Sequence, residues 1–237
     1  MGQTVLVSET LPKFCRKGLE ELGLRPLLLP PFSALSGATA SHTDLLCFLL
    51  DKTAFCYGDY LTECPSLEEA LQQAGYTPRP LGDPIGPAYP RDIGLNGLRL
   101  GKRLFAKLSH FSPSVRSAAE ARGLRLIDVR QGYARCTACP VSEDALITAD
   151  PSIARAAERE GLSVLSISPG HVILEGYPYG FLGGACGVWG DRLLFTGELA
   201  GHPDGEAIAA FCRAHGKEPI SLSREPLTDV GSLFVLE

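Results

Sequence analysis

The chain has 237 residues, of which 45% are hydrophobic and 21% charged, with a formal net charge of -5 at pH 7. This composition is typical of a soluble globular protein. It excludes a membrane-spanning protein, because no apolar run is long enough to cross a bilayer, and it offers no cluster of Lys and Arg to bind a nucleic acid. We therefore expect a single domain over residues 1–237 with neither a nucleic-acid nor a membrane partner. The start of the chain lacks a secretory signal pattern, so we expect a cytoplasmic location with reduced cysteines.

One order of elements occurs five times along the chain: a β-rich run, a helix-like segment, a glycine and a second β-rich run. A period of this size indicates a repeat architecture rather than two unrelated domains. The five units cover residues 4–29, 53–81, 103–129, 144–167 and 192–222.

A glycine follows each predicted helix, at the position where a left-handed residue commonly ends a helix. The gaps between successive glycines are similar, and the gap that wraps from the last one through the chain ends to the first is similar too. We therefore expect a closed ring of units rather than an open solenoid. These residues are Gly23, Gly75, Gly123, Gly161 and Gly216.

An additional strand-like run precedes each unit. Three of these runs open with an aspartate: Asp44 in "TDLLCFLL", Asp92 in "RDIGLNGLRL" and Asp229 in "TDVGSLFVLE". The other two, "RCTACPVS" and "GACGVWG", carry Cys136 and Cys186. Each unit thus reads strand, strand, helix, strand, and the C-terminal run is expected to pair with the N-terminal one. The alternative is an ordinary three-layer α/β sheet.

A ring of five such units resembles the pentein fold, the β/α propeller of the guanidino-group-modifying enzymes. Within that superfamily, residues 132–199 most resemble a bacterial group to which we can assign no reaction. The resemblance implies an α/β fold with a closed five-bladed propeller, whose last blade is closed by the N- and C-terminal strands. It also implies that ligands bind in the central channel, near the beginnings of the first strands.

Arginine deiminases, agmatine deiminases and dimethylarginine dimethylaminohydrolases pair carboxylates at such positions with a substrate guanidinium. The resemblance therefore implies substrate binding by Asp44, Asp92 and Asp229, and the pair Arg91-Asp92 is similar to an Arg-Asp pair of those enzymes. The alternative is that these aspartates only accept hydrogen bonds in turns. Two further side chains are expected to line the same channel, Asn96 and Cys136.

Catalysis in that superfamily uses a cysteine on the first strand of the last unit and a histidine in a His-x-Asp stretch. Here the matching strand has Ser232 and no cysteine. We consider Cys186 as a displaced nucleophile, with His171 as its base and Glu175 orienting the histidine. The alternative is that the surrounding glycines only let the chain pass close to the channel, with Cys186 as a small core side chain.

We expect no metal and no cofactor, because the C-x-x-C of Cys136 and Cys139 has no second pair to complete a zinc site. The remaining histidines are expected to be solvated: His42, His110, His202 and His215. The sequence thus predicts a protein that binds a small guanidino or amine cation, with residual amidinohydrolase or deiminase-like chemistry as an extension. The alternative is a non-catalytic interaction protein with a protein partner, which an exposed apolar patch on residues 25–42 would support.

Overall fold

The computed structural model describes residues 2–237 and contains fifteen short strands and eight α-helices in that range. The first three units contain β1 (Thr4–Ser8), α1 (Lys13–Glu21), β2 (Arg25–Leu29), α2 (Thr43–Leu46), β3 (Cys47–Leu50), β4 (Thr53–Tyr57), α3 (Gly58–Glu63), α4 (Pro65–Gln73), β5 (Thr77–Leu81), β6 (Leu98–Leu100), β7 (Arg103–Ala106), α5 (Pro113–Ala121) and β8 (Arg125–Asp128). The rest contains α6 (Ala134–Thr137), β9 (Ala138–Ser142), β10 (Ala145–Thr148), α7 (Pro151–Arg159), β11 (Ser163–Ser166), β12 (Cys186–Trp189), β13 (Arg192–Phe195), α8 (Gly205–Ala214), β14 (Glu218–Ser221) and β15 (Phe234–Val235). Three short 3-10 turns lie at Gly37–Thr39 (η1), Gly183–Ala185 (η2) and Leu199–Gly201 (η3).

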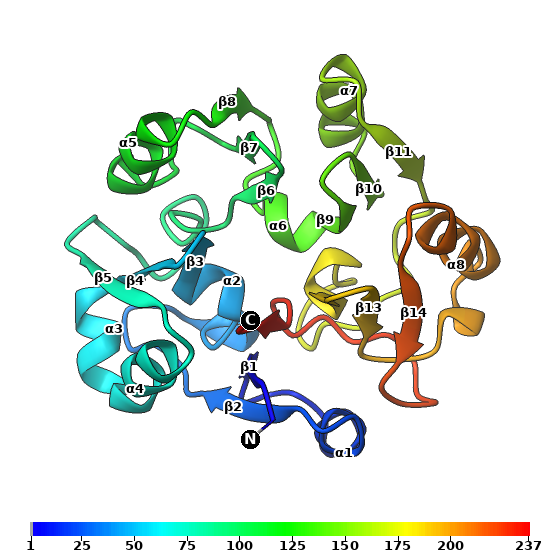
Figure 1. Ribbon diagram of the computed structural model, residues 1–237, viewed down its shortest axis with the longest axis horizontal. Coiled ribbons are helices and arrows are strands. Elements are labelled where there is room, and N and C mark those ends of the chain that lie inside the picture. The colour runs from blue at the N-terminus through cyan, green and yellow to red at the C-terminus, as the bar shows by residue number, and fades with distance from the viewer. Residues whose placement is uncertain (1) are drawn as a thin grey trace.

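The strands form five separate three-stranded sheets, as the repeat predicts. In each sheet the first strand is antiparallel to the second, and the third is parallel to the second after a helical crossover. Figure 1 shows these sheets set around the middle of the molecule, with helices on the outside. The alternative of one ordinary three-layer sheet is therefore wrong. No strand pairing within residues 2–237 joins the five sheets into one closed sheet.

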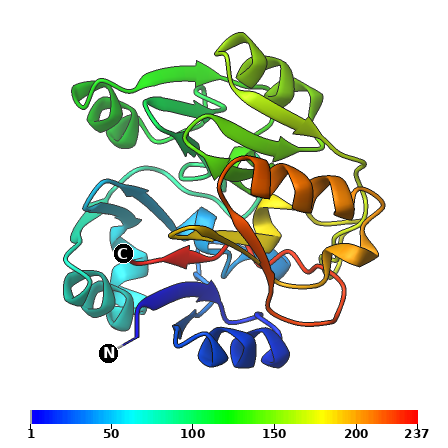
Figure 2. The same ribbon diagram turned by 45° about the vertical axis from the view of Figure 1, so that its right-hand side comes forward.

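The two ends of the chain meet in one sheet. Leu6 of β1 pairs with Phe234 of β15, and Val5 pairs with Val235, in antiparallel register. Figure 2 shows the red C-terminal strand beside the blue N-terminal strand. This confirms that one unit is built from both chain ends, so the segment that precedes β15 reaches the middle of the molecule.

Apolar side chains cover both faces of the sheets. The middle strands β1, β4, β7, β10 and β13 are almost wholly buried, which is typical of strands covered by a helix on one face and by neighbouring sheets on the other. The connector between β2 and α2 contributes to this core, because Leu29, Phe32 and Leu35 are buried. No exposed apolar patch forms from these three side chains. No helix within residues 2–237 has the length and apolarity needed to span a bilayer.

The glycines predicted to end the helices adopt the left-handed conformation, with φ between 72° and 76°. A Cβ atom added at any of these five glycines would meet nothing within 4 Å. The requirement for glycine there is therefore conformational and not steric.

Replacing Gly161 with Ala is expected to lower the free energy of unfolding by about 1 kcal/mol, because a side chain disfavours the left-handed backbone. Urea denaturation measures the change. Gly201→Ala is the matched control, since a Cβ there also meets open space but the backbone is not left-handed. Equal effects of the two substitutions would contradict this explanation.

Candidate functional site

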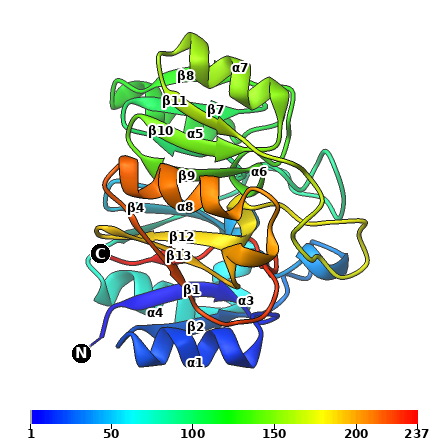
Figure 3. The same cartoon turned by 90° about the vertical axis from the view of Figure 1, so that its right-hand side faces the viewer.

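The segments that precede the first strands of the five sheets converge in the middle of the molecule. Three of them form short helical turns, α2 before β3, α6 before β9 and η2 before β12. Backbone hydrogen bonds connect segments from different sheets: Asp44 N donates to Gly231 O at 3.0 Å, and Ser232 N donates to Gly184 O at 2.8 Å. Figure 3 shows long loops from around residues 82–97 and 168–182 on one side of the molecule.

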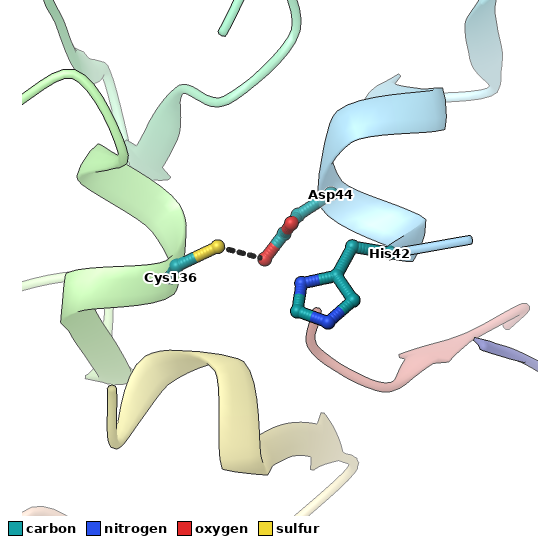
Figure 4. A group of neighbouring side chains, drawn as sticks. All are labelled: His42, Asp44 and Cys136. Atoms are coloured by element: carbon teal, nitrogen blue, oxygen red, sulfur yellow. Dashed lines mark hydrogen bonds between the residues drawn. The ribbon is translucent and has the colours of Figure 1, made fainter. Parts of the chain in front are cut away.

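The carboxylate of Asp44 lies in the centre of this region and is 1% exposed. Its Oδ2 accepts hydrogen bonds from Cys136 Sγ at 2.9 Å and from Ser232 Oγ at 2.7 Å. Its Oδ1 is buried and has no hydrogen-bond partner among the described residues. Burial raises the pKa of Asp44, although neighbouring His42 partly opposes the shift. Figure 4 shows the Asp44 carboxylate between the thiol of Cys136 and the imidazole of His42.

Asn96 holds the Cys136 turn in place. Its Oδ1 accepts hydrogen bonds from Arg135 N at 2.8 Å and Cys136 N at 3.3 Å. Its Nδ2 donates to Cys136 Sγ at 3.2 Å and to Asp44 O at 3.4 Å. The predicted channel residues Asp44, Asn96 and Cys136 are thus brought together by direct contacts. Burial, followed by the charges of Asp44 and Asp229, raises the pKa of the Cys136 thiol.

Asp229 is the second buried carboxylate of the cluster. Its Oδ1 accepts from Gly231 N at 3.0 Å, and its Oδ2 accepts from Phe181 N at 2.9 Å. Burial raises the pKa of Asp229 to about 6 against the effect of these hydrogen bonds. A Cβ atom at Gly184 would collide with this carboxylate, so the glycine-rich segment allows the backbone to approach it closely.

His42 is a site residue that the sequence analysis misplaced. Its side chain is buried, its Nδ1 lies 3.9 Å from Asp229 Oδ1, and its Nε2 has no partner among the described residues. Burial lowers the pKa of His42 to about 4 against the opposing charge of Asp44, so the imidazole is neutral at pH 7. The expectation that His42 and His202 are solvated is wrong, because they are only 1% and 5% exposed. The sequence does contain a pattern that indicates a site histidine at this position, because residues 42–44 form a His-x-Asp stretch.

Asp92 has a different partner from the other two carboxylates. Tyr133 OH donates to Asp92 Oδ2 at 2.7 Å, while Asp92 Oδ1 is buried without a partner. Burial raises the pKa of Asp92, and the Tyr133 hydrogen bond opposes this shift. Of the three aspartates at strand beginnings, the structure therefore places Asp44 and Asp229 around one histidine and pairs the third with a tyrosine.

The structure does not bring Cys186, His171 and Glu175 together. Cys186 is fully buried and donates to Gly183 O at 3.3 Å, whereas His171 and Glu175 are exposed. No hydrogen bond joins these three side chains within the described range. Burial raises the pKa of the Cys186 thiol, but neighbouring Cys139 and Arg135 lower it further, so the net direction is downward. This shift is the one property of Cys186 that suits a nucleophile.

His171 instead lines a surface cavity of about 270 Å³, together with His202. The two imidazole rings are 5.2 Å apart, in an edge-to-face arrangement. His110 is exposed as expected, whereas His215 is half-buried against Phe211.

Ser232 occupies the position at which the resemblance places a cysteine. It is fully buried, and its hydroxyl reaches Gly183 O at 3.1 Å in addition to Asp44. Its φ is 72°, a left-handed conformation that costs a residue with a side chain about 1–2 kcal/mol. Backbone strain of this kind persists where the surroundings fix it, which is frequent at functional sites.

Solved structures of a DDAH, an amidinotransferase and an arginine dihydrolase match this fold. A DDAH from Pseudomonas aeruginosa, solved as a cysteine-to-serine mutant with citrulline, has a TM-score of 0.59 and 11% identity, with coverage of 94% of this chain and 92% of that one. SxtG, an amidinotransferase from Microseira wollei in the saxitoxin biosynthetic pathway, has a TM-score of 0.55 and 13% identity, with coverage of 93% and 88%. The N-terminal domain of ArgZ, a cyanobacterial arginine dihydrolase, has a TM-score of 0.52 and 12% identity, with coverage of 93% and 90%.

These likenesses confirm the resemblance to the pentein superfamily at the level of the fold. No curated protein matches the chain in sequence. Residues 6–234, nearly the whole chain, match the family described as a family of unknown function, DUF6873, and the chain therefore belongs to that family.

Proposed function

We propose that the central cluster binds a small cation that carries a guanidino or amine group, with Asp44 as its main partner. The observation that supports this most directly is the buried Oδ1 of Asp44, which has no hydrogen-bond donor within residues 2–237 although Oδ2 has two. A buried carboxylate oxygen without a donor costs free energy, which a bound ligand with N–H groups would recover. Guanidinium groups donate to carboxylates in a bidentate geometry that suits this need.

The charge around Asp44 supports a cationic ligand. Neither Asp44 nor Asp229 forms an ion pair with Lys or Arg within residues 2–237, and their histidine neighbour is neutral at pH 7. Burial raises the pKa of Asp229 and the charge of Arg135 partly opposes that shift, but the Arg135 guanidinium donates to the backbone oxygens of Ala138, Gly183 and Cys186. Two close carboxylates without a cation repel each other, and a bound cation would relieve that repulsion.

The fold supports the same proposal by analogy. The DDAH, amidinotransferase and arginine dihydrolase with this fold are named for reactions at guanidino groups. We further propose that the five sheets act as the blades of a closed propeller, with Asp44 and Asp229 on its axis. A fold alone does not determine a function, so the binding proposal rests on the contacts of the Asp44 and Asp229 carboxylates.

We extend the proposal to chemistry through Cys136 and His42 in place of Cys186 and His171. The Cys136 proton passes to the neutral His42 imidazole, and the sulfur forms a bond to the guanidino carbon. The C–N bond to the leaving amine then breaks as that amine takes the proton. Water subsequently attacks the same carbon and gives one proton to His42. The C–S bond breaks as the C=O bond forms, the departing sulfur takes the second water proton to restore the thiol, and His42 releases its proton to solvent. A bound cation would favour the thiolate, because it offsets the carboxylate charges that raise the pKa of Cys136.

A ligand can reach the cluster only if a covering segment moves, because Asp44, Cys136 and Asp229 are all at most 3% exposed. We assign this movement to residues 168–182, whose Phe181 N is hydrogen-bonded to Asp229. Gly170 and Gly176 in this segment have left-handed backbones. The alternative function, a non-catalytic interaction protein, gains no support from Leu29, Phe32 and Leu35 of the segment 25–42, because these three side chains are buried.

Arginine, agmatine or a methylated arginine is expected to raise the melting temperature of the wild-type protein. A ligand at 100 times its Kd adds about 2.7 kcal/mol of stability. Asp44→Asn should remove this ligand-dependent shift, because the amide keeps the shape but loses the charge. Asp191→Asn, at an exposed aspartate, is the control and should keep the shift. A wild-type melting temperature that none of these compounds moves would refute the binding proposal.

Cation binding is expected to weaken as the pH falls through about 6, measured as Kd by calorimetry from pH 8 to pH 5. The pKa of Asp229 is raised to about 6, so its carboxylate takes up a proton in this range and loses the charge that favours the ligand. Asp229→Asn should flatten the profile near pH 6. A Kd that is constant from pH 8 to pH 5 would contradict an ionic role for this pair.

If the cluster is catalytic, Cys136→Ser is expected to abolish the release of ammonia, urea or amine from a guanidino compound. Cys186→Ser should retain it, since the Cys186 thiol lies outside the cluster. Mass spectrometry of the quenched wild-type reaction should place a covalent adduct on Cys136. Activity that survives Cys136→Ser but not Cys186→Ser would restore the sequence-based choice of nucleophile.

A further inference from the structure

We propose that His42, Asp44 and Cys136 also form a metal site that takes one zinc ion in place of the organic cation. One ligand atom from each of these residues lies within 4.8 Å of the other two. Figure 4 shows the three side chains pointing toward one another from two different turns, α2 and α6. The inference goes beyond the proposed function, because it concerns a metal ion and not an organic cation. Zinc binding requires only these three side chains.

The donor set indicates which metal the site would take. A thiolate sulfur, an imidazole nitrogen and a carboxylate oxygen are the ligands of zinc, and three protein ligands leave the fourth position open. The thiolate disfavours Mg²⁺ and Ca²⁺, which prefer oxygen ligands. The cluster is thus suited to Zn²⁺ and to its spectroscopic substitute Co²⁺.

Two polar atoms of these side chains have no hydrogen-bond partner within residues 2–237. His42 Nε2 and Asp44 Oδ1 are buried without hydrogen bonds among the described residues, in side chains that are about 1% exposed. Such atoms are rare in folded proteins, and an unfilled ion site is one reason for them. A metal among the three side chains would give the Asp44 carboxylate a further partner, and Figure 4 shows Nδ1 of His42 on the side of Asp44 and Cys136.

The surrounding hydrogen bonds would hold the ligands as outer partners do in metal proteins. Asn96 Nδ2 donates to Cys136 Sγ at 3.2 Å, which stabilises a thiolate. Ser232 Oγ donates to Asp44 Oδ2 at 2.7 Å, and the Asp229 carboxylate lies 3.9 Å from His42 Nδ1. The ligands and their supports therefore come from segments that are already in contact.

The charges and protons balance when the metal binds. The Cys136 thiol loses its proton to solvent, and the resulting thiolate and the Asp44 carboxylate offset the two positive charges of Zn²⁺. No electron is transferred. Binding thus releases a proton and becomes tighter as the pH rises. Zinc and the organic cation both need Asp44, so each would exclude the other.

The test is a titration of the full-length, metal-free protein with Co²⁺ and then Zn²⁺. We expect about one Co²⁺ per chain, with the near-ultraviolet charge-transfer absorption of a thiolate ligand, and its loss when Zn²⁺ displaces the Co²⁺. Cys136→Ser should remove the absorption and weaken Zn²⁺ binding by more than about 100-fold, the upper end of what loss of an outer partner costs. Cys186→Ser, at another buried thiol, should keep both. Absorption that survives Cys136→Ser, or none in the wild type, would overturn the site.

A second measurement covers the case in which Cys136→Ser does not fold. X-ray absorption of the wild-type zinc protein should show one sulfur among nitrogen and oxygen ligands, and a shell without sulfur would overturn the site. A protein that binds zinc but binds no guanidino compound would refute the proposed function and support this inference. A protein that binds a guanidino compound that zinc does not displace, and that shows no Co²⁺ absorption, would support the proposed function and refute this inference.

Discussion

The antiparallel pairing of β15 with β1 is the constraint on which the centre of this protein depends. It places the segment before β15 next to the turn before β3, where Asp44 N donates to Gly231 O and Ser232 Oγ donates to the Asp44 carboxylate. Without this pairing, Asp229 and Ser232 would belong to a free end of the chain. Hydrogen bonds thus link the segment before β15 to α2 and η2. The buried cluster is enclosed by segments that come from different sheets.

The cluster holds two buried carboxyl groups, and no Lys or Arg within residues 2–237 forms an ion pair with either of them. Burying an ionised carboxylate costs several kcal/mol unless a partner compensates it. Raised pKa values at Asp44 and Asp229 are the physical expression of that cost. The left-handed backbone of Ser232 shows that the surrounding structure holds this residue in place at a further cost. A bound cation would compensate the negative charges of these carboxylates. The organic cation and zinc would both do so through their positive charge.

The proposed chemistry differs from the chemistry that the resemblance implies in the sheet that supplies the thiol. The segment before β15 carries Ser232, while Cys136 from the α6 turn reaches the same carboxylate oxygen as that serine. His42 and Asp44 come from the α2 turn in a His-x-Asp stretch, so the thiol, imidazole and carboxylate derive from two turns. In a ring of similar units the segments before the first strands are near one another. A side chain with a given role can therefore come from a different unit without a change of fold.

The sequence by itself determined the units, the left-handed glycines after the helices and the pairing of the chain ends. These features follow from local backbone preferences and from hydrophobic patterns that repeat along the chain. It also placed Asp44, Asp229, Asn96 and Cys136 near the beginnings of first strands. Only the tertiary structure decided that Cys136 and Ser232 both bind Asp44, that Tyr133 binds Asp92, and that Cys186 is separated from His171 and Glu175. The physical reason is distance along the chain: the partners of Asp44 are 92 and 188 residues away, and no local pattern encodes which side chains meet across the middle of the molecule.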